Sequence, residues 1–277
     1  MLITGGTGQL GTAMRRLVPE ADFPTRNELD LSAPAGVAAY LERIRPEAIV
    51  NCGAYTAVDR AEEEEDLATV VNGQSVGVMA RFAADAGIPF VTFSTDYVFD
   101  GQATEPYLES HPTDPINAYG RSKLAGEQAA LGTHEGALVI RTSWVISGTH
   151  PNFVATMLRL AAERDTLSVV ADQRGCPTCV EDLAPGALAA LRSGATGLLH
   201  LTNAGETTWH GLASAAIAEA GLEVAVEPIA TEDYPTPAKR PAYSVLGSER
   251  REGLGIDALP DWRDTLPTIV AGLRSRS

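Results

Sequence analysis

Short apolar runs separated by amphipathic stretches recur along most of the chain. A continuous apolar run predicts a strand that is buried on both faces, and apolar residues three to four positions apart predict a helix that covers a sheet. Strands are expected at 2–4, 48–55, 88–93, 137–143 and 198–202. Helices are expected after Gly11 as far as Val18, and over 70–86, 184–191, 209–220 and 265–273. Strands that alternate with helices predict an α/β fold with a doubly wound parallel sheet.

The later part of the chain is less regular, and it predicts a second, smaller unit. Proline-rich residues 228–241 are expected to form a loop. We expect residues 1–145, with later contributions from around 176–203, to form the sheet domain. Residues 146–277 are expected to form mainly a smaller C-terminal lobe, built from discontinuous segments.

Composition and charge narrow the classes of partner. The 277 residues are 44% apolar, which suffices for one large core and a smaller lobe, and the formal net charge is −15. This negative charge argues against nucleic acid or an anionic membrane as a partner. No apolar run reaches about 18 residues and no basic segment opens the chain, so we expect no membrane span, no secretion signal and a cytoplasmic location. The three cysteines cannot all pair and are typical of cytosolic thiols.

A glycine-rich turn follows the first apolar run. Gly5, Gly8 and Gly11 are spaced as in G-x-x-G-x-x-G, a variant of the fingerprint of Rossmann dinucleotide-binding domains. The first glycine permits a tight turn, the second lets backbone approach the cofactor's diphosphate, and the third lets the helix pack on the strand. Gln9 and Leu10 lie in the same turn and are expected to contact the cofactor. A glycine-rich turn without a ligand is the alternative.

Further cofactor contacts are expected from the next two segments. Arg26 can accept the 2′-phosphate of NADPH, whereas an acidic residue there would favour NADH; an exposed arginine without a ligand is the alternative. Asp30 and Leu31 are expected along the adenine edge. We therefore predict NADPH as the cofactor, with NADH still open. The run 48–55 is expected to end at the cofactor with Cys52, Gly53, Ala54 and Tyr55.

Tyr119 and Lys123 are the candidate reacting pair. They lie four residues apart, so on a helix both side chains leave the same face. A phenol has a pKa of about 10, and a nearby ammonium is expected to lower it toward the working range. Such a pair suits proton delivery to a carbonyl oxygen. The alternative is an amphipathic helix with an aromatic anchor and a solvated lysine.

Motifs spread over nearly the whole chain resemble those of the extended short-chain dehydrogenase/reductase superfamily. More narrowly, they are similar to the dTDP-4-dehydrorhamnose reductase family. The matching segments are 8–11, 54–59, 94–100, 119–123, 141–145, 172–178 and 240–241.

The resemblance implies roles for three catalytic residues. Thr95 would hydrogen-bond the substrate carbonyl, Tyr119 would donate the proton, and Lys123 would bind the nicotinamide ribose and tune Tyr119. Related sugar-nucleotide dehydratases carry a glutamate base where this chain has Tyr97. The resemblance therefore implies carbonyl reduction in place of elimination. Asp96 is expected to contact the substrate or to hold a structural hydrogen bond.

Several further residues are implied on the substrate side. Trp144 would line the sugar pocket, although a core tryptophan is the alternative. Arg240 is the candidate for the diphosphate, because a guanidinium binds phosphate oxygens bidentately. Ile146 stands where the family usually has tyrosine, which leaves the details of the pocket open. The complete set of expected substrate contacts is Thr56, Val58, Thr95, Asp96, Tyr97, Trp144, Asn152, Phe153, Gln173 and Arg240.

The resemblance implies NAD(P)H-dependent reduction of the C4 ketone of dTDP-4-dehydro-L-rhamnose to dTDP-L-rhamnose. A reductase of another dTDP-deoxysugar and a non-catalytic regulatory subunit are alternatives, although intact Thr95, Tyr119 and Lys123 speak against the latter. A redox or metal role for Cys176 and Cys179 would need a second ligand pair or a thioredoxin-like context, and neither is evident. We predict no metal. A homodimer is compatible with the resemblance, but the acidic, metal-bridged contact of some family members has no match here.

Overall fold

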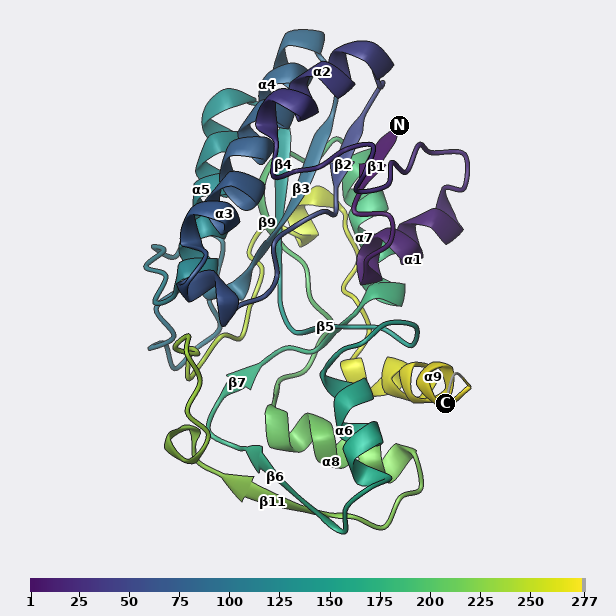
Figure 1. Cartoon of the computed structure of the whole chain (residues 1–277), viewed down its shortest axis with the longest axis vertical. Helices are drawn as coiled ribbons and strands as arrows, with labels where there is room; N and C mark the ends of the chain where they lie inside the picture. Colours follow the sequence, from purple (N-terminus) through teal and green to yellow (C-terminus); the bar gives the residue numbers. More distant parts are fainter. Residues whose placement is uncertain (276–277) are drawn as a thin grey trace.

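A five-stranded parallel sheet forms the upper layer of the protein in a computed structural model that describes residues 1–275 (Figure 1). The strand order is β1-β2-β3-β4-β9. The strands span Leu2–Thr4 (β1), Ile49–Asn51 (β2), Phe90–Thr95 (β3), Ala137–Thr142 (β4) and Gly197–His200 (β9). All five expected strands are therefore present, most of them shorter than the apolar runs that predicted them.

Helices cover both faces of this sheet. They span Gln9–Leu17 (α1), Pro34–Ile44 (α2), Ser75–Ala86 (α4), Ala118–Thr133 (α5) and Val180–Arg192 (α7). Ile3 and Val50 pack in one core with α1 and α7, whereas their neighbours Leu2 and Ile49 pack in another with α2, α4 and α5. Successive strand residues point to opposite faces, so a sheet covered on both sides requires strands that are apolar throughout.

The strand order reverses beside β1. Leu2 pairs with Ile49 of β2 on one side and makes an isolated parallel bridge to Asp22 on the other. The chain after β1 therefore runs first to Asp22 on one side of this strand. It then crosses to the other side, where β2, β3, β4 and β9 follow. In doubly wound sheets, ligands bind in the crevice outside the carboxyl ends of the strands at such a reversal.

A smaller lobe lies below the carboxyl ends of the strands (Figure 1). Its helices are Phe153–Ala161 (α6), Trp209–Glu219 (α8) and Trp262–Arg274 (α9). Its short strand pairs are Thr166–Val170 with Ala225–Ile229 (β6, β11), Val145–Ile146 with Thr178–Cys179 (β5, β8) and Arg174–Gly175 with Thr207–Thr208 (β7, β10). Trp262, Ile146 and Leu212 are buried together in the core of the lobe.

The structure differs from the sequence-based expectation at several places, since α2, α6 and the short strand pairs of the lobe were not expected. Residues 228–241 are not loop throughout, because β11 extends to Ile229 and a short 3₁₀ turn covers Thr231–Asp233. The expected helix over 70–86 begins as a short Glu65–Thr69 helix (α3) and a π-helical turn at Val70–Gln74 before α4. Among the helices of residues 1–275, none is long and apolar enough to cross a membrane.

Candidate active site

A cleft of about 770 Å³ follows the carboxyl ends of the sheet strands and reaches the lobe. Most of the residues expected to bind cofactor or substrate line it. They are Gly5, Gly8, Gln9, Leu10, Arg26, Asp30, Leu31, Cys52, Gly53, Ala54, Tyr55, Thr56, Val58, Thr95, Asp96, Tyr97, Tyr119, Lys123 and Trp144.

The glycine turn has the shape of a diphosphate cradle. Gly5 has a φ of 67°, and the Gly8 N–H donates to the Gly5 carbonyl at 2.9 Å. A Cβ on Gly11 would lie 2.1 Å from that carbonyl oxygen, so only glycine lets α1 start against the turn. Gly8 has no side chain with which to cap α1, and the first N–H groups of the helix are therefore available to an anion. The residues present thus fit a dinucleotide cofactor.

Arg26 and Asp30 line the part of the cleft where the sequence predicts the cofactor's adenosine. The Arg26 side chain is 84% exposed, and its Nε lies 4.0 Å from Asp30 Oδ1. Hydrogen bonding from the Ser32 N–H lowers the pKa of Asp30, which keeps this carboxylate ionised. Leu31 packs against Gly53, where an added Cβ would meet the leucine at 2.6 Å. The floor of the cleft is thus apolar, with a guanidinium at its rim.

Thr95, Tyr119 and Lys123 meet where β3 ends beside α5. The Thr95 hydroxyl donates to Asp96 Oδ1 at 2.9 Å and accepts from the Tyr97 N–H at 3.2 Å. Lys123 Nζ donates to the Phe93 carbonyl at 2.6 Å. All three catalytic candidates therefore lie on one stretch of the cleft wall.

Helix α5 is held in place at its first turn. Asn117 caps it by accepting from the Gly120 N–H at 2.8 Å. A Cβ on Gly120 would lie 2.2 Å from the Tyr97 carbonyl oxygen, so glycine allows the helix to touch the end of β3. The spacing of Tyr119 and Lys123 on one face of a helix, which the sequence predicted, is confirmed.

The pKa of Tyr119 moves in the direction opposite to the one that the sequence pattern predicted. Burial raises this pKa, the nearby Asp96 carboxylate raises it further, and a hydrogen bond with Thr95 offsets only part of the rise. Burial also lowers the pKa of Lys123 to about 8, against the opposing effect of Glu127. The physical reason is desolvation, which disfavours phenolate and ammonium alike. Tyr119 is thus a fully protonated donor at neutral pH.

Asp96 is the most perturbed carboxyl group in the cleft. It is 2% exposed, and its Oδ2 has no hydrogen-bond partner among the described residues. Burial raises the pKa of Asp96 to about 6, although hydrogen bonds from neighbouring hydroxyls restrain the rise. The carboxyl group therefore changes its charge close to neutral pH.

Replacing Asp96 should alter how stability depends on pH. The folded pKa of about 6 exceeds the unfolded value of 3.8, so the folded state holds an extra proton between these values and its stability falls as the pH rises through them. We therefore expect the stability of Asp96→Asn relative to the parent to increase from pH 4 to pH 8, by up to about 3 kcal/mol. Urea unfolding at both pH values measures this gain. If the free energies of unfolding of variant and parent differed equally at both pH values, the raised pKa of Asp96 would be contradicted.

Trp144 lines the cleft together with Trp209, a residue that the sequence did not single out, and the two form a tryptophan wall. The Trp144 ring stacks on Trp209 with centroids 3.5 Å apart and 5° between the planes. Trp144 has a φ of 44°, which is strained for a bulky residue and is typical of functional sites. Gly175 leaves room for the ring, because a Cβ there would lie 2.4 Å from Trp144 Cε2.

Four expected substrate contacts do not line the cleft. Asn152 caps α6 by accepting from the Ala155 N–H at 3.1 Å, and Phe153 packs on Trp209 with centroids 4.6 Å apart. Gln173 accepts from Trp209 Nε1 at 3.1 Å. Phe153 and Gln173 thus support Trp209, whereas Asn152 holds the start of α6.

Arg240 is the fourth of these residues. It forms a bidentate ion pair with Asp59, with nitrogen–oxygen distances of 2.9 and 3.0 Å. This pair ties the loop after β2 to the proline-rich segment of the lobe. Its guanidinium thus binds the Asp59 carboxylate, and Arg240 is not among the residues that line the cleft.

Other cleft residues were not expected. Ser94, Thr142 and Ser143 lie at the carboxyl ends of β3 and β4, and polar residues that close an apolar run were the signal that could have revealed them. Trp209 and His150 reach the cleft only through the packing of the lobe. No local pattern in the sequence marks those two.

A family model described as "RmlD substrate binding domain" matches residues 1–275. The chain belongs to this family. A dTDP-4-dehydrorhamnose reductase from Burkholderia thailandensis is 44% identical over 301 aligned residues, covering 100% of this chain and 99% of the relative. A "Probable dTDP-4,6-dihydroxy-2-methyloxan-3-one 4-ketoreductase" from Streptomyces antibioticus is 42% identical and covers 98% and 95%.

A solved structure agrees with these relatives. The crystal structure of a dTDP-4-dehydrorhamnose reductase from Bacillus anthracis in complex with NADP has a TM-score of 0.93 to this chain, at 37% identity, with 98% of each chain covered. The resemblance drawn from the sequence motifs is confirmed.

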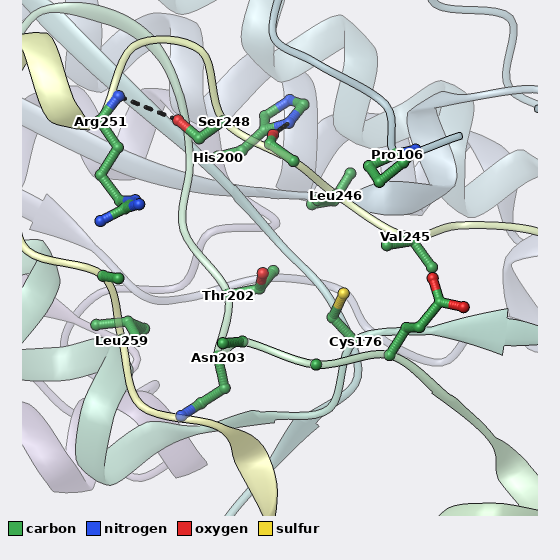
Figure 2. A pocket seen from close by; sticks show the side chains of 15 residues that line it. Pro106, Cys176, His200, Thr202, Asn203, Val245, Leu246, Ser248, Arg251 and Leu259 are labelled. Carbon is green, nitrogen blue, oxygen red and sulfur yellow. Dashed lines mark hydrogen bonds between the residues drawn. The ribbon is translucent and has the colours of Figure 1, made fainter.

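The two cysteines of the C-x-x-C motif lie in different surroundings. Cys176 lines a second cavity of about 390 Å³ beside Thr202 and Val245 (Figure 2), whereas Cys179 is buried in the core of the lobe. Burial raises the pKa of both thiols, that of Cys176 to about 11. Thiols that stay protonated are poor nucleophiles and poor metal ligands. Residues 1–275 also contain no group of three or more side chains placed to hold a metal ion.

Proposed function

We propose that this chain reduces the C4 ketone of dTDP-4-dehydro-L-rhamnose to give dTDP-L-rhamnose, with NADPH as the reductant. A relative named dTDP-4-dehydrorhamnose reductase matches the full chain at 44% identity, which supports this proposal. The observation that carries the proposal is the grouping of Thr95, Tyr119 and Lys123 on the wall of a cleft that starts at the glycine turn. In this proposal the turn binds the cofactor's diphosphate, and Lys123 binds the nicotinamide ribose.

The chemistry follows from the state of these side chains. Bound NADPH supplies the hydride to the carbonyl carbon. The Thr95 hydroxyl turns toward the carbonyl oxygen, and the protonated Tyr119 gives its proton to the oxygen as negative charge develops there. Lys123 lies at the Phe93 carbonyl, between Tyr119 and the strand end, where its ammonium can hold ribose hydroxyls.

Elimination is disfavoured by Tyr97. Burial raises the pKa of this phenol, so it stays protonated and cannot act as the base that dehydration at the neighbouring carbon requires. The ring of Tyr97 instead packs edge-on against Tyr119, with centroids 5.9 Å apart. Reduction is the chemistry that this pair supports.

The purified full chain, incubated with NADPH and dTDP-4-dehydro-L-rhamnose, tests the proposal. We expect NADPH to be oxidised in equal amount to the dTDP-L-rhamnose formed, with the configuration at C4 read by NMR. The Streptomyces antibioticus relative favours a second candidate, reduction of a different dTDP-4-keto sugar. A higher kcat/KM for such a sugar than for dTDP-4-dehydro-L-rhamnose would support that candidate. Cofactor binding without turnover of any of these sugars would indicate a regulatory subunit.

Arg26 should determine the preference for NADPH over NADH. A 2′-phosphate at the adenosine end would pair with its exposed guanidinium, and this contact does not exist for NADH. We expect Arg26→Ala to weaken NADPH binding about 10- to 100-fold. NADH binding should change less than about twofold. Fluorescence titration of both cofactors measures this, and equal losses for the two would remove Arg26 from the 2′-phosphate site.

A further inference from the structure

A histidine from the lobe reaches the glycine turn. His150 Nε2 lies 3.1 Å from the Thr7 carbonyl oxygen and 3.3 Å from Thr12 Oγ1. Its Nδ1 lies 2.9 Å from Thr149 Oγ1. A carbonyl can only accept, so Nε2 carries a proton that points at the turn. The side chain also lines the cleft.

Three basic side chains are spaced along the cleft, and each lies where a different part of the cofactor is expected. Among the described residues that line the cleft, the side chains able to carry positive charge are Arg26, His150 and Lys123. Arg26 lies at the adenosine end and Lys123 beside Tyr119. His150 lies between them, at the turn whose N–H groups fit a diphosphate. His150 therefore places a side-chain N–H donor at the turn, in a chain of net charge −15.

The same lobe segment holds the turn through further contacts. Gln9 Nε2 donates to the Val145 carbonyl at 3.2 Å, and Asn152 Nδ2 lies 3.4 Å from Gln9 Oε1. Asn152 caps α6, whose first residue Phe153 packs on Trp209. Residues 145–152 therefore connect the cofactor turn to the tryptophan wall.

We propose that His150 binds the cofactor's diphosphate from the lobe side, so that cofactor binding fixes residues 145–152 and prepares the tryptophan wall for the sugar nucleotide. The inference rests on the proposed function, because it assumes a nicotinamide cofactor in the cleft. A diphosphate oxygen replaces the Thr7 carbonyl as the acceptor for Nε2–H. The diphosphate is common to NADPH and NADH, and both cofactors gain the contact equally.

Titrations of the full chain with NADPH and NADH test this assignment. We expect His150→Ala to weaken both cofactors about tenfold, and His150→Gln, which keeps an N–H donor, to restore part of the affinity. Arg26→Ala is the matched control, because it should affect NADPH alone. Unchanged affinity for both cofactors in His150→Ala, or a loss confined to NADPH, would overturn the proposal. The urea midpoint of each variant shows whether it is folded.

A second experiment tests whether His150 links cofactor binding to the sugar-nucleotide site. We expect saturating NADPH to raise the affinity of the parent for dTDP, and His150→Ala to lose most of this gain. An equal gain in both proteins would show that His150 does not link the two sites. These binding results are independent of turnover. Failure of the parent to reduce any dTDP-4-keto sugar would instead count against the proposed function.

Discussion

Tyr119→Phe should lower kcat with dTDP-4-dehydro-L-rhamnose by about 100- to 10,000-fold, the range that general acid catalysis contributes. The variant removes the proton that this buried phenol retains at neutral pH, and it leaves the ring that packs against Tyr97. NADPH affinity should remain close to that of the parent. Steady-state kinetics and cofactor titration together measure the effect.

Tyr97→Phe is the matched comparison for this prediction. It removes a phenolic hydroxyl that is also buried at the cleft, whereas the hydrogen bond with the Thr95 hydroxyl belongs to Tyr119. We expect its main effect on KM, with a much smaller loss of kcat. If Tyr119→Phe kept more than a tenth of the parent's kcat, another group would have to supply the proton.

Arg141→Met should lower the free energy of unfolding by about 3–5 kcal/mol, as expected when one partner of a buried ion pair is removed. Arg141 and Glu127 side chains are each 3% exposed, and the guanidinium donates to both carboxylate oxygens at 2.8 and 2.6 Å. The variant would leave the Glu127 carboxylate buried without its counter-charge. Urea denaturation at neutral pH measures the loss.

The double variant Glu127→Gln with Arg141→Met provides the control. It removes both charges, so we expect it to be more stable than Arg141→Met alone. A loss below about 1 kcal/mol in the single variant would mean that water reaches the carboxylate. The pair also has a functional consequence, because it joins α5 to β4 and so holds Tyr119 and Lys123 against the sheet.

The electrostatics of the cleft favour a protonated Tyr119. An exposed phenol beside an ammonium would have a lowered pKa and would be partly ionised at mildly alkaline pH. Burial keeps Tyr119 protonated, and in the proposed reduction the developing sugar oxyanion is the base that takes this proton. Lys123, whose pKa falls to about 8, remains largely charged at neutral pH.

Much of the sheet domain could be predicted because its signals are local. Each buried strand is a short apolar run, and the glycines at 5, 8 and 11 meet steric demands within a single turn. The pair β6–β11 was not predicted, since its strands lie at the edge of the lobe with exposed residues interspersed. Its apolar residues are too few to stand out as a run.

The sequence alone predicts the five strands of the main sheet, the glycine turn, and the placement of Tyr119 and Lys123 on one helical face. Those properties depend on residues within a few positions of one another. Tertiary packing instead sets the pKa of Tyr119, which burial raises, and brings Asp59 to the guanidinium of Arg240. Likewise, only the folded lobe brings Trp209 onto Trp144 and His150 to the turn. Desolvation and contacts between distant segments arise from the packed volume around each side chain, which no local pattern encodes.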